Sequence, residues 1–373
     1  MATAGYFRTS AHIDLNALEE NYRSIAALVG PGVTLLPVIK ADAYGHGAVR
    51  AGLRLQSIGA GYLAVASIDE AMELRKNGVS CPILVLSGVM PWEDVRIFVE
   101  NDVTPTVIGF DSLERTSAHK SPKPLKIHVK IDTGMGRLGF SLGDLGTLLE
   151  QLRRMEERIQ VEGLMSHFAS SELRDDYGVG QVDAFRGALE SFRNAGIEPT
   201  FVHMANSAAI CDYPEAHFTM VRPGIMLYGS YPDKSLRGMV RLKQVMRWTS
   251  SVCYVRTLPA HTSLSYGRTH VTQRETKVAY VPLGYADGFP RSLSNRGSVL
   301  IRGKRCRIMG TVCMEWVLAD VTEVADVAPG EEVVIIGASG QETITADEVA
   351  DLAGTIPYEI LCGVSRRVPR LYG

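Results

Sequence analysis

The sequence predicts an α/β protein in which an N-terminal (β/α)8 TIM-type barrel is followed by a mostly antiparallel β domain. Three observations favour this fold class. Over residues 33–230, eight short apolar runs alternate with amphipathic stretches. The runs are continuously apolar, as in parallel strands covered on both faces. Beyond residue 241, β-rich runs follow one another without helical insertions, which is typical of a separate β domain.

The predicted barrel strands end where helical patterns begin. They cover residues 33–40, 62–66, 83–87, 104–108, 125–131, 161–167, 200–204 and 220–228. Helices are expected between them, for example at 67–77, where Ser67 and Glu70 have the spacing of a capping box, and at 145–158. Eight such units favour closure into a barrel. An open doubly wound sheet is the alternative, but the glycine-rich turn of a dinucleotide site is absent from the sequence.

We assign residues 1–240 to the barrel and residues 241–373 to the β domain. In the second part, strands are expected at 245–257, 277–281, 297–309, 312–321 and 332–337, and short helices at 346–352 and 358–362. The sequence contains no low-complexity linker between the two parts. The domains are therefore expected to pack firmly against each other.

Composition narrows the class of protein. With 46% hydrophobic and 21% charged residues, the chain is typical of a soluble globular protein. Its net charge of -2 predicts neither a nucleic-acid partner nor an anionic membrane. The six cysteines are scattered and lack zinc-site spacing, which favours a reducing compartment. The first residues lack the apolar core of a signal peptide, so we expect a cytoplasmic protein with no membrane span.

Several charged and polar residues lie at the C-terminal ends of the predicted strands. In barrels of this kind, that is the end where active sites are found. Lys40 ends the first strand and precedes Gly45 and Gly47, which we interpret as glycines that let the backbone approach a ligand closely. A solvated lysine at the start of a loop is the alternative. The other residues at this rim are Arg137, His167, Asn206, Ser207, Arg222, Gly224 and Ile225.

A lysine facing a phosphate site would suit a phosphorylated aldehyde held as a Schiff base. Barrels often bind phosphate with the loops after strands 7 and 8. Ser207 offers a hydroxyl there, and Gly224 and Ile225 offer backbone N–H groups. Pyridoxal phosphate meets both demands. A Schiff-base aldolase acting on sugar phosphates would also meet them, so both remain open at this point.

With these residues in place, the chain resembles the alanine racemases along essentially its whole length. The motifs that carry the resemblance are VIKADAYGHG at 38–47, KIDTGMGRLG at 130–139, HMANS at 203–207, RPGI at 222–225, LSYG at 264–267, GYADG at 284–288, GTVCM at 310–314 and PY at 357–358. The first motif is shared with related barrel enzymes. The ordered set is specific to this family.

The resemblance implies pyridoxal 5'-phosphate as the cofactor. Lys40 matches the family's Schiff-base lysine. The residues that match its phosphate site are Tyr44, Ser207, Gly224, Ile225 and Tyr358. Arg222 matches an arginine facing the cofactor's ring nitrogen, where a permanent cation keeps the pyridine unprotonated and disfavours side reactions such as transamination.

Two further residues are assigned through the resemblance. Arg137 matches an arginine near the cofactor's phenolic oxygen and the substrate carboxylate. Lys130 matches a lysine that is carbamylated in many family members and positions that arginine; a plain amine paired with Asp132 is the alternative.

The implied reaction interconverts L-alanine and D-alanine through a pyridoxal-phosphate aldimine. Moving a proton from one face of Cα to the other requires one swinging base or two bases, and two fit this chain better. Lys40 serves one face, and Tyr266 matches the family's second base. An ordinary tyrosine has a pKa of about 10 and needs a nearby cation or donor, for which His167 is the candidate.

In the family this tyrosine comes from the partner subunit, as do the residues that match Cys313 and Met314, which help bind the substrate carboxylate. The resemblance therefore implies a homodimer with shared active sites. The implied role is the supply of D-alanine, a peptidoglycan precursor, for the bacterial cell wall. One departure is Glu315, followed by Trp316, where the family commonly has aspartate; we expect it to alter the pocket entrance.

Other interpretations remain. His167 alone is more often a core histidine, Tyr266 an interface tyrosine and Arg222 half of a salt bridge. His46 and Asp42 have metal-ligand spacing but no third ligand, so we predict no metal. Among functions, a racemase for serine or a basic amino acid, a barrel-type decarboxylase and a non-catalytic pyridoxal-phosphate carrier are the alternatives. The β domain disfavours the carrier, and the motif around Tyr266 disfavours the decarboxylase.

Overall fold

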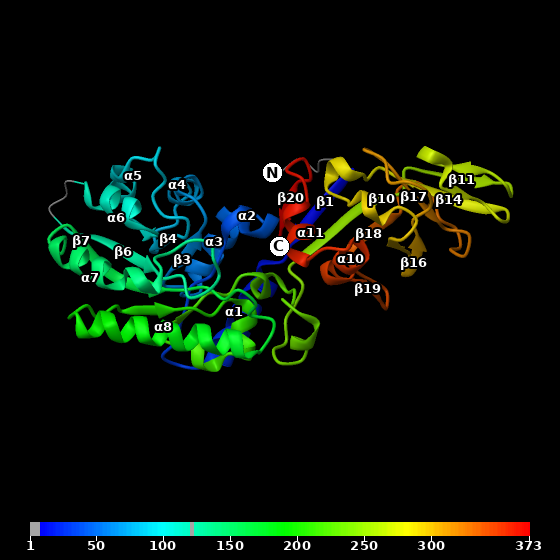
Figure 1. Ribbon diagram of the computed structural model, residues 1–373. Helices are drawn as coiled ribbons and strands as arrows, with labels where there is room; N and C mark the ends of the chain where they lie inside the picture. Colours follow the sequence, from blue (N-terminus) through cyan, green and yellow to red (C-terminus); the bar gives the residue numbers. More distant parts are fainter. Residues whose placement is uncertain (1–7, 120–122) are drawn as a thin grey trace.

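The structure is a computed structural model that describes residues 8–119 and 123–373. Figure 1 shows an elongated molecule with a helix-covered barrel at one end and a β domain at the other. Strands β1 and β20, the first and last strands along the described chain, lie at the junction of the barrel and the β domain. Within the described part of the chain, no helix combines the length and the apolar character needed to cross a membrane.

The barrel is an eight-stranded parallel sheet, which confirms the predicted fold class. Its strands are β2 (Thr34–Leu35), β3 (Leu63–Val65), β4 (Ile83–Val85), β5 (Val103–Val107), β6 (Leu125–Lys130), β7 (Ile159–Met165), β8 (Phe201–His203) and β9 (Met220–Val221). They pair in the order β2-β9-β8-β7-β6-β5-β4-β3. A parallel bridge between Val38 and Ala64 joins the two ends of this order and closes the sheet. Each of the eight predicted runs overlaps a strand.

Helices cover the outside of the barrel, as Figure 1 shows for α4 to α8. They are α1 (Leu15–Val29), α3 (Ala48–Ser57), α4 (Ile68–Lys76), α5 (Val95–Glu100), α6 (Phe110–Ser117), α7 (Leu145–Arg154), α8 (Asp176–Asn194) and α9 (Ser207–Asp212). The predicted capping box starts α4: the N–H of Glu70 donates to Ser67 Oγ, and the Glu70 carboxylate returns to the backbone N–H of Ser67. This places Glu70 beside Ala41, whose N–H it also accepts.

A second sheet joins the two parts of the molecule. Its strands are β1 (Thr9–Ile13), β10 (Met246–Ser251), β15 (Ser298–Ile301), β16 (Lys304–Arg307), β18 (Glu332–Ser339), β19 (Glu342–Ile344) and β20 (Arg370–Tyr372). Strand β1 runs antiparallel to β10 and parallel to β20. The first strand of the chain therefore lies in the sheet of the β domain, which was not predicted because a single five-residue alternation carries little signal.

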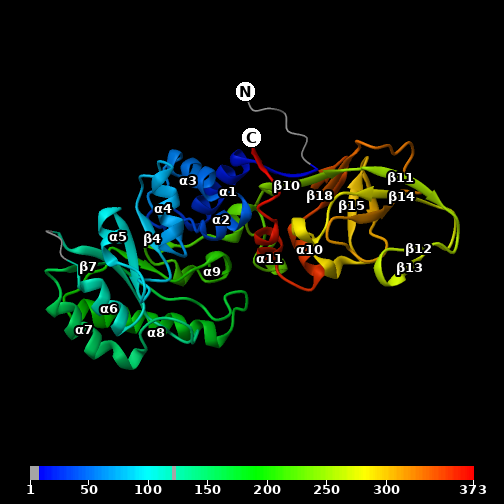
Figure 2. The ribbon, with the colours of Figure 1, turned by 90° about the horizontal axis from the view of Figure 1, so that it is seen from above.

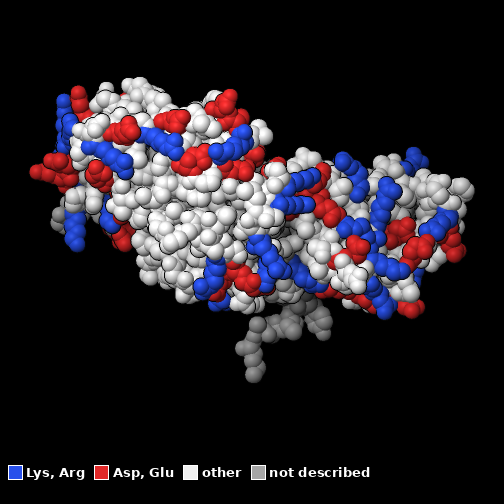
Figure 3. Space-filling model, turned by 90° about the horizontal axis from the view of Figure 1, so that it is seen from below, with Lys and Arg blue, Asp and Glu red and all other residues white. Residues whose placement is uncertain are grey.

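The rest of the β domain is a three-stranded sheet, a short hairpin and two helices. The sheet consists of β11 (Tyr254–Leu258), β14 (Thr276–Val281) and β17 (Val317–Asp320), and the hairpin of β12 (Ser263–Leu264) and β13 (His270–Val271). Helices α10 (Ala346–Ala353) and α11 (Pro357–Gly363) confirm the predicted pair. Figure 3 shows basic and acidic side chains interspersed on the face it draws.

The β domain has more and shorter strands than the sequence predicted, because turns interrupt several of the predicted runs. The runs 245–257 and 297–309 each contain two strands. The run 312–321 is a strand only from Val317, because the residues before it form a loop that packs against Gly284.

Candidate active site

The strand ends of the barrel bring together the basic residues predicted for the site. Lys130 ends β6, His167 follows β7, and Arg222 follows β9. Lys40 follows the short strand β2 and begins α2 (Lys40–Gly45). Burial is the main cause that lowers the pKa of the Lys40 amine, and the charges of Arg137 and Arg222 lower it further against the opposing charge of Glu70. A lowered pKa makes the neutral amine available for chemistry.

The turn after Lys40 is left-handed. Residues Ala41 to Tyr44 have φ of 52 to 54° and ψ of 40 to 51°, a conformation that costs about 1–2 kcal/mol per residue. Two carboxylates hold it: Glu70 Oε1 accepts the N–H of Ala41 at 2.6 Å, and Asp42 Oδ1 accepts the N–H of Ala48 at 2.7 Å. The strained turn fixes where Lys40 and Tyr44 point.

The glycines of this segment have a different role from the one predicted. A Cβ on Gly45 would overlap the carbonyl oxygen of Leu361, and one on Gly47 would overlap the hydroxyl of Tyr372. Both glycines therefore permit close packing against the C-terminal segment, and the interpretation that they admit a ligand is wrong. His46 is buried, with Nδ1 within 3.0 Å of the carbonyls of Ala43 and Tyr44, and stacks on Tyr228.

The residues predicted to hold a phosphate lie together. The ring centroids of Tyr44 and Tyr358 are 5.8 Å apart, and the N–H of Gly224 donates to Ser207 Oγ at 2.9 Å. A Cβ on Gly224 would lie 2.6 Å from Tyr44 Oη and 3.9 Å from Ser207 Oγ. Ile225 opens the short helix η3 (Ile225–Tyr228), so its N–H points out of the helix end. Burial raises the pKa of both tyrosines, which therefore remain hydrogen-bond donors.

Arg222 is buried and held by acceptors on two neighbouring strand ends. Nη1 donates to His203 Nδ1 at 2.9 Å and to His203 O at 3.0 Å. Nη2 donates to His167 Nδ1 at 2.9 Å, to Ser166 O at 2.8 Å and to Met204 O at 3.0 Å. Burial lowers the pKa of Arg222 to about 9, so it stays charged at neutral pH. Within residues 8–119 and 123–373 its Nε has no hydrogen-bond partner, and the predicted salt-bridge alternative is not found.

Lys130 and Arg137 are not paired with Asp132 side chain to side chain. The Asp132 carboxylate accepts backbone N–H groups, including those of Met135 at 2.8 Å and Arg137 at 3.0 Å. In the described chain, neither Lys130 nor Arg137 has an ion pair. Burial, then the charges of Arg222 and Arg137, lower the pKa of Lys130 to about 8. The paired-amine alternative for Lys130 is therefore not what the structure shows.

The residues predicted in the β domain form a second group. Tyr266 begins η5 (Tyr266–Arg268), and its carbonyl accepts the hydroxyl of Thr311 at 2.8 Å. Ser265 Oγ lies 3.4 Å from Cys313 Sγ, which places Tyr266 beside the loop of Met314. The side chains of Tyr266 and Met314 are 72% and 53% exposed. Figure 2 shows β12 and β13, which flank Tyr266, at the end of the β domain away from the barrel. One chain therefore does not bring Tyr266 to Lys40.

Three polar residues inside the barrel were missed. His203 was part of a motif but had no predicted role, and His128 on β6 and Glu162 on β7 lie in runs that were interpreted only as strands. His203 Nε2 lies 2.8 Å from His128 Nδ1. A signal was present, because charged and imidazole side chains within otherwise apolar strands are uncommon unless they are paired.

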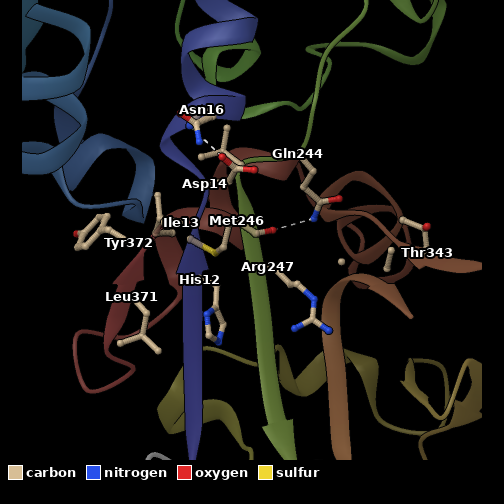
Figure 4. A pocket seen from close by; sticks show the side chains of 14 residues that line it. His12, Ile13, Asp14, Asn16, Gln244, Met246, Arg247, Thr343, Leu371 and Tyr372 are labelled. Atoms are coloured by element: carbon tan, nitrogen blue, oxygen red, sulfur yellow. Dashed lines mark hydrogen bonds between the residues drawn. The ribbon is translucent and has the colours of Figure 1, made fainter. Parts of the chain in front are cut away.

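The junction of the domains contains a cavity of about 600 Å³ away from these residues. Figure 4 shows His12 on β1 beside Arg247 on β10 at its wall. Its charged groups are already paired: Arg247 binds Glu332 through two hydrogen bonds of 2.8 and 2.6 Å, and Asp14 caps α1. We therefore place the chemistry at the strand ends.

Comparison with known proteins matches both domains to one family. The family profile "Alanine racemase, N-terminal domain" matches residues 13–232, and "Alanine racemase, C-terminal domain" matches residues 245–372. The chain is 44% identical to "Alanine racemase 2" of Caldanaerobacter subterraneus subsp. tengcongensis, covering 98% of this chain and 94% of that protein. It is 43% identical to "Alanine racemase" of Halothermothrix orenii, covering 98% and 96%.

Solved structures show the same similarity. The alanine racemase from D-cycloserine producing Streptomyces lavendulae has a TM-score of 0.93 at 36% identity, covering 99% of this chain and 98% of that one. The alanine racemase from Bacillus anthracis with bound L-Ala-P has a TM-score of 0.92 at 34% identity, covering 100% and 96%. The similarity therefore extends through both domains and their junction.

Proposed function

The chain belongs to the alanine racemase family, and we propose that it interconverts L-alanine and D-alanine with pyridoxal phosphate as cofactor and with Lys40 and Tyr266 as its two bases. One observation carries the proposal. An amine with a lowered pKa, a cradle suited to a phosphate and a buried guanidinium meet at one rim of the barrel. The supply of D-alanine for peptidoglycan and the cytoplasmic location stay predictions.

The residues present suit this cofactor. Lys40 would hold its aldehyde carbon, Tyr44 and Tyr358 would donate to its phosphate, and the lack of a side chain on Gly224 leaves room beside the Tyr44 hydroxyl. Ser207 and the N–H of Ile225 complete the phosphate site. When bound, the cofactor supplies a conjugated ring that spreads the negative charge left on the substrate's α-carbon.

Arg222 sets the protonation of the ring nitrogen that would face it. A guanidinium only donates hydrogen bonds, so a nitrogen facing its Nε must accept one and carries no proton. The histidine and carbonyl acceptors on Nη1 and Nη2 leave Nε for this contact. By keeping that nitrogen unprotonated, Arg222 would disfavour transamination and favour return of the proton.

The two proton transfers then take place on opposite faces. Lys40 Nζ, whose lowered pKa favours the neutral amine, exchanges a proton with one face of the α-carbon. Tyr266 Oη of the partner subunit exchanges a proton with the other face. Removal by one base and delivery by the other inverts the centre, and the reverse reaction exchanges their roles.

His167 would assist Tyr266 of the partner subunit. Because Arg222 donates to His167 Nδ1, the ring proton must be on Nε2. Burial first, then the charge of Arg222, holds the pKa of His167 well below its ordinary value, so the ring is neutral. A neutral Nε2–H can donate to the oxygen of Tyr266 and stabilise its deprotonated form.

Arg137 would bind the substrate carboxylate. Its side chain is exposed at the rim, and the N–H groups bound by Asp132 fix the loop that presents it. Lys130, with its pKa of about 8, has a substantial neutral fraction in mildly alkaline solution. A neutral amine is the form that reacts with carbon dioxide, and a carbamate there would attract Arg137 electrostatically.

A homodimer would complete the site. Tyr266 and Met314 are predicted site residues, yet they are exposed and lie on the β domain, apart from Lys40. Exposed Tyr285 and Trp316 extend the apolar surface around Met314. A second copy that placed this surface over the barrel rim would supply the missing base.

The test measures D-alanine formed from L-alanine, with and without added pyridoxal phosphate, alongside L-serine and L-lysine. We expect alanine to react fastest and activity to disappear when the cofactor is stripped. No racemisation of alanine, or equal rates for the other amino acids, would overturn the proposed substrate.

A further inference from the structure

A row of buried polar groups runs through the barrel interior from Arg222 to Glu162. Arg222 Nη1 lies 2.9 Å from His203 Nδ1, and His203 Nε2 lies 2.8 Å from His128 Nδ1. His128 Nε2 lies 3.7 Å from Glu162 Oε2. The two histidine rings are completely buried, and Arg222 and Glu162 are buried too. Arg222 directly follows β9, His203 is on β8, and the row ends with His128 on β6 and Glu162 on β7, so it spans four neighbouring strands of the sheet.

The local packing leaves room for this row. Gly163 on β7 pairs with His128 on β6, and a Cβ on Gly163 would overlap the His128 ring. The ring also packs against the edge of the Tyr62 ring, 5.8 Å away between centroids. The position of His128 is therefore fixed from two sides.

The proton positions follow from the chemistry of the first member. Arg222 only donates, so His203 Nδ1 must accept and its proton must be on Nε2. That proton points at His128 Nδ1, so the proton of His128 must be on Nε2 as well. Burial lowers the pKa of both imidazoles, which keeps them neutral with one proton each.

The last N–H of the row faces a charged carboxylate. His128 Nε2 is buried and has no hydrogen-bond partner among the described residues, and 3.7 Å is longer than a hydrogen bond. Glu162 therefore acts on it as a nearby negative charge. Although burial alone would raise it, the pKa of Glu162 is held at about 2 by His128 and Lys126. Tyr62 Oη at 3.1 Å and Lys126 Nζ at 2.7 Å fix the carboxylate.

We propose that Glu162 is a positioning residue that, through His128 and His203, keeps both imidazoles in the Nε2–H form and thereby holds Arg222 in its place at the active site. Without the carboxylate, only the contact with Arg222 opposes the reversed arrangement, in which His128 donates from Nδ1 and His203 carries its proton on Nδ1. That proton would point at an N–H of the Arg222 guanidinium, and two donors that face each other cannot form a hydrogen bond. Arg222 would then lose its contact with His203 and shift from the ring nitrogen.

The importance of this shift for the reaction rests on the proposed function, whereas the proton positions do not. Arg222 has no ion pair within the described chain, so neutral acceptors alone hold its guanidinium. Replacing one acceptor by a donor would therefore displace it. The tautomers can be read directly by NMR of enzyme labelled with 15N-histidine, whatever the enzyme's activity.

The experiment compares wild type with Glu162→Gln, Glu162→Asp and two matched controls. Tyr62→Phe and Lys126→Met each remove one contact of the carboxylate but keep its charge. We expect Nε2–H signals for His128 and His203 in the wild type and in both controls. In Glu162→Gln, His203 should populate the Nδ1–H form, and kcat should fall by about 10- to 100-fold, as for other outer-shell partners. Glu162→Asp should restore the wild-type tautomer and most of kcat.

Three outcomes overturn the proposal. The first is an Nδ1–H form of His203 in the wild-type enzyme. The second is a Glu162→Gln enzyme that keeps both wild-type tautomers while kcat falls, because the residue would then act only through stability, which the melting temperature would report. The third is unchanged tautomers with unchanged kcat. If alanine is not racemised at all, the proposed function fails, while the tautomer comparison still decides this proposal.

Discussion

Glu315 and Arg367 form a two-bonded ion pair at the edge of the loop that carries Met314. Oε1 of Glu315 lies 3.1 Å from Nη1 of Arg367, and Oε2 lies 2.6 Å from Nη2. Arg8 adds a bond of 2.6 Å to the same carboxylate, and Arg367 also binds Asp287 at 2.7 Å. The departure from the family pattern at residue 315 therefore ties together three segments far apart in the sequence.

Replacing Glu315 by Gln should loosen this loop without affecting cofactor binding. Hydrogen bonds from Arg367 and Arg8 hold the pKa of Glu315 at about 2, so the carboxylate is charged under all assay conditions. Exposed ion pairs contribute little to the free energy, so we expect KM for alanine to rise only about two- to fivefold. Steady-state kinetics and a cofactor titration measure both effects. Glu332→Gln breaks the equivalent pair with Arg247 far from the loop and should leave KM unchanged; an equal rise in both variants would contradict the assignment.

The buried amine of Lys130 should make stability depend on pH. Its pKa is about 8 in the folded protein and close to the ordinary lysine value of 10.5 when unfolded. Between these values the unfolded state binds more protons, so the free energy of unfolding rises with pH across this window. The rise is about 3 kcal/mol over the whole window, at 1.36 kcal/mol per unit. Lys130→Met should lack it, and urea unfolding in carbon-dioxide-free buffer from pH 7 to 10 measures the difference. Parallel pH profiles for the two proteins would show that Lys130 is not desolvated.

Mixed dimers test whether two subunits share one site. Lys40→Ala and Tyr266→Phe homodimers should each lose nearly all activity, because each lacks one base at both sites. A heterodimer of the two, purified with different tags, has one site with both bases and one with neither. We expect it to regain about half of the wild-type kcat per dimer. If both bases came from the same subunit, the heterodimer would stay inactive, and a monomer by sedimentation would also contradict the proposal.

Much of the barrel could be predicted from the sequence because parallel strands are continuously apolar. Each of the eight runs overlaps a strand, although the first strand ends at Leu35, five residues before Lys40, and the last ends at Val221, directly before Arg222. The capping box at Ser67 could also be predicted from the sequence, since it needs only two residues at a fixed spacing. These signals are local, and tertiary packing reinforces them.

The parts that could not be predicted depend on contacts between distant segments. Strand β1 pairs with β10, more than 230 residues later, and nothing within its five residues specifies that partner. The row from Arg222 to Glu162 needs the sheet order to bring His128 and His203 together. The role of Gly45 depends on Leu361, which the fold places against it.

The left-handed turn after Lys40 offers a final test of how the fold controls the site. Gly45 has φ of 82°, and a Cβ there would overlap the backbone carbonyl of Leu361. Gly45→Ala therefore adds both a backbone penalty of about 1 kcal/mol and a clash that displaces the turn carrying Lys40 and Tyr44. We expect cofactor affinity, measured by absorbance titration, to fall at least about tenfold.

Gly59→Ala is the matched control for that variant. Gly59 has φ of 96° but no atom within 4 Å of the added Cβ, so it carries only the backbone penalty. It should lower the melting temperature while leaving cofactor affinity and kcat at their wild-type values. Because the two variants share the penalty and differ in the contact with Leu361, a difference in affinity isolates that contact. Equal affinities would mean that the packing of Gly45 against the C-terminal segment does not position Lys40.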